Sequence, residues 1–164
     1  MLHEDKIVCC FIGHRTIPEP EPVIEQVENW VQLLLSTGKP LRFLNGGMGY
    51  FDKICCDAVA KYKNLDPQRP IEHWLVIPYV TSNLQADKKN LQKVYDKIIQ
   101  PSFPEGMPRQ TALPARNHWM VDQSDYALAY ITHPSGGAYQ TFSYALQRPH
   151  ISVMHIGGLT LPNP

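Results

Sequence analysis

Short apolar runs alternate with segments of helical periodicity along the chain, and this alternation restricts the fold more than any other feature. Runs rich in strand-forming residues predict five strands, at 6–12, 41–44, 74–77, 126–131 and 150–156. Apolar positions spaced by three and four residues predict helices at about 23–35, 51–62, 86–99, 113–123 and 139–147. Such alternation is typical of an α/β domain in which a doubly wound, mainly parallel sheet of five strands carries helices on both faces.

The length of the chain predicts one domain. Its 164 residues fall within the usual size of a single domain, and no linker divides them. The segment 101–112 contains prolines and no clear period, so we expect a loop there. We assign residues 1–156 to this α/β domain and residues 157–164, which have no helix signal, to a C-terminal tail.

Targeting and cysteine patterns indicate a cytoplasmic protein. The first residues carry acids ahead of any apolar stretch, unlike a signal peptide. No apolar run approaches the ~20 residues of a membrane-spanning helix. The four cysteines form two adjacent pairs, 9–10 and 55–56, without metal-ligand spacing. We therefore expect reduced thiols, no metal site and no contact with a membrane.

The charge balance argues against nucleic acid as the partner. Fifteen basic and fifteen acidic residues give a formal net charge of zero. Proteins that bind nucleic acid through its backbone phosphates are usually basic, because they must neutralise those charges. A small-molecule ligand is the expected partner.

Two glycine-rich turns follow predicted strands and open helices. One reads NGGMG at 45–49 and the other SGG at 135–137. Paired glycines let backbone N–H groups approach an anion, and a helix N-terminus adds a favourable potential. Because the carboxyl ends of parallel strands share one edge of the sheet, both turns are expected on one rim. A tight turn without any ligand is the alternative explanation of each.

Further polar residues are expected on the same rim. Arg116 and Asn117 are predicted in about the first turn of their helix, where an arginine fork suits a phosphate. Asp52, just inside the helix that follows the first glycine turn, is a candidate for contacting a ribose or a water molecule, and Tyr79 follows the third predicted strand. The candidate ligand- and phosphate-binding residues are Gly13, His14, Arg15, Asn45, Gly46, Gly47, Gly49, Arg116, Asn117, Ser135, Gly136 and Gly137.

Neither turn matches a strong nucleotide motif. The patterns GxGxxG and GxxxxGK[ST] are absent, which argues against a conventional dinucleotide dehydrogenase and a P-loop NTPase.

Four stretches together resemble a known superfamily. They read CCFIGHR at 9–15, NGGMGYFD at 45–52, LVIPY at 75–79 and RNHWMVDQSDYALAYITHPSGGAYQTFSYA at 116–145. They resemble the SLOG superfamily, and most closely its YpsA-like bacterial branch, over about residues 6–156. The same superfamily contains the Lonely Guy phosphoribohydrolases and DNA-processing protein A. The resemblance implies a Rossmann-like SLOG domain at 1–156 and a pocket for a nucleotide or an ADP-ribose-like ligand, with no required cofactor. Tyr79 is then the candidate for stacking on the base of that ligand. By analogy it also implies a homo-oligomer, most simply a homodimer.

One departure from the superfamily bears on catalysis. The phosphoribohydrolases that the chain resembles at Arg116 and at Gly136-Gly137 carry a glutamate in a PGGxGTxxE loop. This chain has no carboxylate between Asp125 and its C-terminus. Cleavage of a glycosidic bond needs a carboxylate near the developing positive charge, and only Asp52 offers one. The leading hypothesis is therefore a nucleotide-binding or sensing protein. The alternatives are a nucleoside-monophosphate phosphoribohydrolase that uses Asp52 and, with less support, a single-stranded DNA-binding protein.

Overall fold

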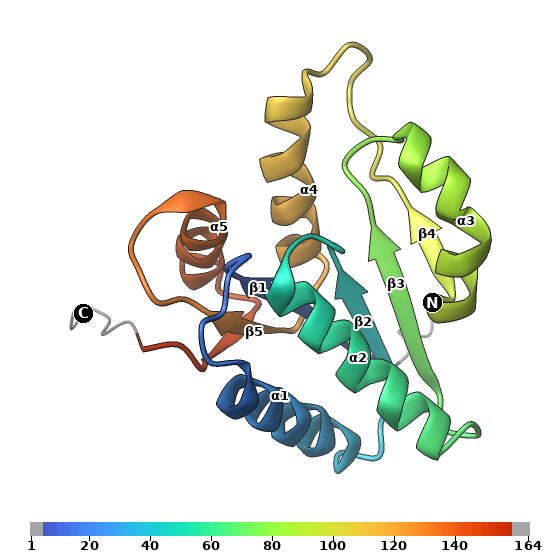
Figure 1. The fold of residues 1–164 in the computed structure, drawn as a ribbon. Helices are drawn as coiled ribbons and strands as arrows, with labels where there is room; N and C mark the ends of the chain where they lie inside the picture. Colours follow the sequence, from blue (N-terminus) through green and yellow to red (C-terminus); the bar gives the residue numbers. More distant parts are fainter. Residues whose placement is uncertain (1–4, 159–164) are drawn as a thin grey trace.

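The computed structural model describes residues 5–158 and contains, within them, six strands and five helices (Figure 1). The strands are β1 Ile7–Gly13, β2 Leu41–Asn45, β3 Ile71–Val76, β4 Lys97–Ile99, β5 Tyr126–Tyr130 and β6 Ser152–His155. The helices are α1 Pro20–Leu35, α2 Tyr50–Leu65, α3 Ser82–Val94, α4 Arg109–Asp122 and α5 Gly136–Leu146. The expected α/β class is confirmed.

All six strands are parallel and lie in the order β4-β3-β2-β1-β5-β6. The chain builds the sheet outward from β1 to β4, then crosses back and adds β5 and β6 on the other side of β1. The order therefore reverses between β1 and β5. In open parallel sheets, the loops that leave the strands on the two sides of such a reversal diverge, and ligands bind in the crevice between them.

Strand β1 is buried on both faces, as its nearly continuous apolar sequence predicts. Cys9 and Phe11 belong to the cluster formed with α1 and α2, whereas Cys10 and Ile12 belong to the cluster formed with α4 and α5. Helix α3 packs through Leu84 and Leu91 on a third, smaller cluster. Two helical layers thus hold the central strand and fix the position of the loop that follows it.

Several element boundaries predicted from the sequence are wrong. The strand expected at 74–77 begins at Ile71, and the helix expected from residue 86 begins at Ser82. The segment 86–99 is not wholly helical: α3 ends at Val94, and Lys97–Ile99 forms the sixth strand, at the edge of the sheet beside β3. The spacing of Leu91, Val94 and Ile98 matches a helical face, and a three-residue strand is too short to show alternation.

The predicted loop at 101–112 is also too long. Helix α4 begins at Arg109, after Pro108, and continues through Pro114. Pro114 is the sixth residue of this helix, beyond its first turn, so the helix lacks the one backbone hydrogen bond that an N–H at this position would donate. Proline is typical of loops but does not exclude a helix here, and α4 begins one turn closer to the N-terminus than expected.

Two further expectations can be compared with the structure. No helix within residues 5–158 is long and apolar enough to cross a membrane. The tail expected at 157–164 lies outside the described residues except for Gly157 and Gly158, so that assignment stays a prediction.

Candidate functional site: a cleft where the strand order reverses

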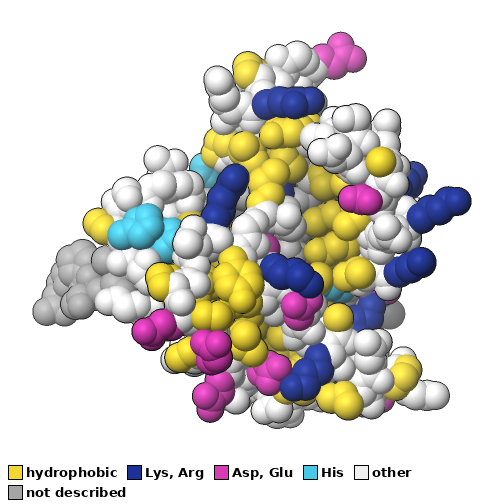
Figure 2. Space-filling model, in the orientation of Figure 1, with side chains coloured by type: hydrophobic (Ala, Val, Ile, Leu, Met, Phe, Trp, Pro, Cys, Tyr) yellow, Lys and Arg dark blue, Asp and Glu magenta, His cyan; other side chains and the backbone are white. Residues whose placement is uncertain are grey.

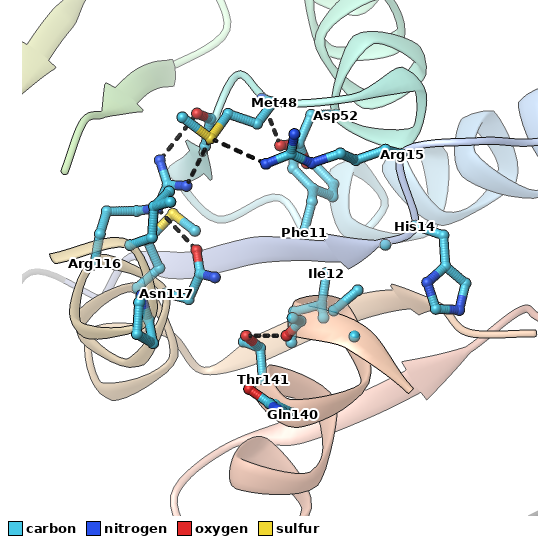
Figure 3. A pocket seen from close by; sticks show the side chains of 18 of the residues that line it. Phe11, Ile12, His14, Arg15, Met48, Asp52, Arg116, Asn117, Gln140 and Thr141 are labelled. Atoms are coloured by element: carbon cyan, nitrogen blue, oxygen red, sulfur yellow. Dashed lines mark hydrogen bonds between the residues drawn. The ribbon is translucent and has the colours of Figure 1, made fainter. Parts of the chain in front are cut away.

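A cleft of about 750 Å³ opens at the carboxyl ends of β1 and β5, where the strand order reverses (Figure 3). Its walls are the turns that follow β1, β2 and β5, together with α4 and the first residues of α5. Its volume lies within the range of pockets that hold small molecules, about 300–1,000 Å³. The predicted site residues that line it are Gly13, His14, Arg15, Gly46, Asp52, Arg116, Asn117, Ser135, Gly136 and Gly137.

Four predicted site residues are not in the cleft lining. Asn45, Gly47 and Gly49 belong to the first glycine turn but do not line the cleft, and Tyr79 lines a separate pocket beside it. Both glycine turns nevertheless lie at one edge of the sheet, as the rule for parallel strands predicts.

The first glycine turn is held by its own side chains. The Gly47 N–H donates to Asn45 Oδ1 at 2.7 Å, and the Met48 N–H donates to Asp52 Oδ2 at 2.9 Å. The Asn45 Nδ2 donates to the Asp52 carbonyl at 3.0 Å, which ties the turn to the start of α2. These two amides were expected to face an anion, and they already have acceptors within the protein.

Arg116 does not lie in the first turn of its helix, as predicted, but in the third turn of α4. Its side chain is buried. Its Nη1 donates to the carbonyls of Gly46, at 3.0 Å, and Val76, at 2.8 Å, and its Nε donates to Asn117 Oδ1 at 2.8 Å. Arg116 thus joins α4 to the ends of β2 and β3. The earlier start of α4 explains the error, because it moves Arg116 from the helix end to its middle.

Two guanidinium groups converge on the thioether of Met48 (Figure 3). Arg116 Nη2 lies 3.5 Å and Arg15 Nη2 lies 4.0 Å from Met48 Sδ. The backbone of Arg15 is fixed because its carbonyl accepts from the Tyr50 N–H at 2.9 Å. Met48 was not predicted as a site residue, and nothing in an apolar side chain within a glycine turn indicates such a position.

Within residues 5–158, Asp52 is the only acidic residue that lines the cleft. Burial raises the pKa of its carboxyl to about 6, although the Met48 N–H and the charges of Arg116 and Arg15 act in the opposite direction. The carboxyl is therefore mostly ionised at neutral pH and gains a proton in mildly acidic solution.

The second glycine turn has the opposite character from the first. Ser135 precedes α5 without capping it, since its hydroxyl pairs with His133 Nδ1 at 2.9 Å. Gly136 has φ +90°, and a Cβ built on Gly136 or Gly137 would meet no atom within 4 Å. The start of α5 therefore faces open space in the cleft.

Two histidines stack across the reversal of strand order. The rings of His14, after β1, and His133, after β5, lie 3.8 Å apart with planes 9° from parallel. His14 is 8% exposed, and its buried Nε2 has no hydrogen-bond partner in the part of the chain that the structure describes. Burial, and then the charge of His133, lower the pKa of His14. His133 was missed as a site residue, although its place just before the SGG turn was a usable signal.

Comparisons with known proteins identify the architecture. No family model matches the chain, and no curated protein matches it either. Among solved structures, a DNA processing protein A from Helicobacter pylori aligns with a TM-score of 0.61 and 17% identity, over 91% of this chain and 64% of that one. The fold resembles that of DNA processing protein A. The same protein from Streptococcus pneumoniae aligns with a TM-score of 0.67 and 19% identity, over 94% of this chain and 52% of that one.

These matches extend to the fold and no further. At identities below 20%, the likeness to DNA processing protein A is one of architecture, and it fits the Rossmann-like core that the SLOG resemblance implied. This chain spans less than two thirds of the length of either protein. The Helicobacter pylori structure is described as having a single-stranded DNA binding mode, which is a property of that protein.

Proposed function

We propose that this protein binds a nucleotide or nucleotide-derived ligand of the ADP-ribose type, with the phosphates in the cleft between β1 and β5. The observation that carries the proposal is the convergence of Arg15 Nη2 and Arg116 Nη2 on Met48 Sδ. A thioether is a weak acceptor, whereas phosphate oxygens are strong acceptors for guanidinium groups. A phosphate oxygen in place of the Met48 sulfur would meet both arginines, and the flexible methionine side chain can move aside.

A second feature favours an anion at the other side of the cleft. The first turn of α5 has backbone N–H groups without a side-chain cap, and the helix adds positive potential there. His14, buried beside it with an unpartnered Nε2, offers a further donor when that nitrogen carries the proton. Two anion-binding positions in one cleft suit a ligand that carries two phosphates.

The residues of the cleft favour binding over hydrolysis. Among the described residues, Asp52 is the only carboxylate in the lining, and its Oδ2 already accepts from the Met48 N–H. Glycosidic cleavage usually employs a pair of carboxylates. A phosphoribohydrolase that depends on Asp52 alone remains the alternative, and release of free base distinguishes it from a binding protein.

Calorimetric titration with ADP-ribose, AMP and NAD tests the proposal, with ribose as a probe that lacks phosphate. A phosphate-bearing probe should bind and ribose should not. The Arg15→Met variant should weaken binding at least tenfold, the scale of one charge-assisted hydrogen bond. The matched control is Lys89→Met, which removes an exposed cation of α3 outside the cleft. The proposal fails if none of the three probes binds, or if both variants bind equally well.

A second candidate function is single-stranded DNA binding, because the Helicobacter pylori protein of similar fold is described as binding such DNA. The zero net charge of this chain opposes that function. Titration with oligothymidylates of increasing length separates the two candidates. Affinity that rises with length and falls steeply with salt supports DNA binding. Affinity no higher than that of a mononucleotide supports a small ligand.

A further inference from the structure

A second pocket, of about 280 Å³, adjoins the cleft on the other side of Met48. Gly46 and Met48 line both cavities, so one ligand that crosses this turn would enter the two of them. Figure 2 shows hydrophobic side chains gathered in the hollow between α4 and α3, the region where this pocket lies. Nothing in the phosphate-binding proposal uses it.

The walls of the second pocket are mostly apolar. They comprise Leu75, Ile77, Pro78, Leu84 and Leu91, with the buried Tyr95 beneath. Its volume lies just below the range of pockets for whole ligands, which fits a single ring system rather than a complete nucleotide. Gly47 lies against Leu75, at a distance where a Cβ would be 2.7 Å from Leu75 Cδ1, so the turn closes directly over the apolar wall.

An aromatic ring and two polar side chains complete the pocket. Tyr79 lines it, with the Arg109 guanidinium 4.6 Å from the centre of its ring. Asn83 and Asp87 lie four residues apart on α3, which puts them on one face of the helix at the rim. An ionised aspartate only accepts hydrogen bonds, whereas an asparagine amide both donates and accepts them.

We propose that this pocket is a nucleobase subsite that selects guanine, with Asp87 accepting from the ring N1–H and the exocyclic amine and Asn83 donating to the carbonyl O6. The inference rests on the proposed function, since the phosphates occupy the larger cleft. It replaces the adenine of an ADP-ribose-type ligand by guanine, so the adenine probes would bind through their phosphates and gain no hydrogen bonds in this pocket. Guanine presents two adjacent N–H donors, and a carboxylate can accept hydrogen bonds from both at once. Adenine presents an unprotonated ring nitrogen beside its amine, which a carboxylate repels. The apolar walls and Tyr79 supply contact for the faces of the base.

Titration calorimetry with GMP, IMP, AMP and ribose 5-phosphate tests the subsite. GMP should bind about tenfold more tightly than AMP, the equivalent of one hydrogen bond to a charged group. IMP, which lacks the exocyclic amine, should fall between them. Ribose 5-phosphate should bind most weakly, because it reaches only the larger cleft.

Two variants and a control separate the subsite from the phosphate site. Asp87→Asn should abolish the preference for GMP over AMP, and Leu84→Trp should fill the pocket and remove the advantage of GMP over ribose 5-phosphate. Both should leave the affinity for ribose 5-phosphate unchanged. Glu25→Gln removes an exposed carboxylate of α1, remote from the pocket lining, and should keep the preference for GMP.

The outcomes distinguish the two proposals. If ribose 5-phosphate binds as tightly as GMP, or Asp87→Asn keeps the GMP preference, the subsite is refuted while the phosphate cleft stands. A preference for AMP refutes the selection of guanine. If none of the four probes binds, the proposed function itself is overturned, and the subsite with it.

Discussion

The burial of Arg116 leads to a prediction about the protein without any ligand. Replacing this arginine by methionine keeps much of the side-chain volume but removes every donor. The carbonyls of Gly46 and Val76 then lose the charged group that now satisfies them, and Asn117 loses its partner. If Arg116 served the ligand alone, its loss would leave the stability of the free protein nearly unchanged.

The size of the effect follows from these contacts. Leaving a buried acceptor without a partner costs about 1–3 kcal/mol, so two such carbonyls together cost about 2–5 kcal/mol after partial relaxation. For a domain of this size, each kcal/mol lowers the melting temperature by about 2–4 °C. Arg116→Met should therefore lower it by roughly 4–20 °C. The melting temperature of Arg116→Lys should lie between those of the wild type and Arg116→Met, because an ammonium group can donate to the carbonyls without reproducing the planar fork.

Differential scanning calorimetry of the free protein measures this effect directly. The matched control is Arg109→Met, also on α4, whose guanidinium lies over the Tyr79 ring at the surface and contributes about 1 kcal/mol or less. Equal melting temperatures for Arg116→Met and Arg109→Met would refute the reasoning, since Arg116 would then not join α4 to the sheet.

Three further predictions concern the cleft. Met48→Glu places a carboxylate between Arg15 and Arg116, so ADP-ribose binding measured by calorimetry should fall at least tenfold. Met48→Leu is the control and should retain the binding. Equal affinities of the two variants for ADP-ribose would contradict the proposed phosphate position. Gly137→Asp puts an acid in the first turn of α5, where no described atom obstructs it. Chemical denaturation should show about 0.5–1.5 kcal/mol more stability, while the affinity for ADP-ribose should fall. A rise in both the stability and the affinity would contradict the anion position. Folding raises the pKa of Asp52 from 3.8 to about 6, so its contribution to stability is fully present below pH 3.8 and is lost as the pH rises through 6. Asp52→Asn should therefore gain about 3 kcal/mol relative to the wild type between pH 4 and pH 7 in denaturation measurements, and a constant difference across that range would contradict the raised pKa.

The fold was predictable from the sequence because its signals are local. The apolar runs at β1, β2 and β5 are long enough to distinguish strands from helices, and the glycine turns mark where the strands end. Parallel topology then brings those turns to one edge without any knowledge of side-chain packing. The short edge strand β4 was missed because three residues do not establish a period.

The roles of individual side chains were less predictable because they depend on how deeply each side chain is buried and on which segments surround it. The sequence indicates that Arg116 lies near the cleft, but its burial depends on where α4 begins and on two distant carbonyls. One is Val76, at the end of β3 and 40 residues away, and the other is Gly46, in the turn after β2 and 70 residues away. The position of Met48 between two guanidinium groups likewise arises from the meeting of three separate segments. The spacing of residues along the chain does not predict such contacts.

The two glycine turns look alike in sequence and differ in what their glycines permit. In the first turn, a Cβ on Gly46 would approach the Arg116 guanidinium at 3.2 Å, and one on Gly49 would approach the Arg15 backbone at 2.7 Å. Glycine is needed there so that both arginines can pack against the turn, whose amides at Gly47 and Met48 are internally bonded. In the second turn, Gly136 and Gly137 have open space beside them and leave the start of α5 accessible. An anion would therefore be held by side chains at the first turn and by backbone amides at the second. Because only the side-chain contacts depend on residue type, arginine substitutions should weaken a ligand with a single phosphate more completely than one whose second phosphate reaches α5.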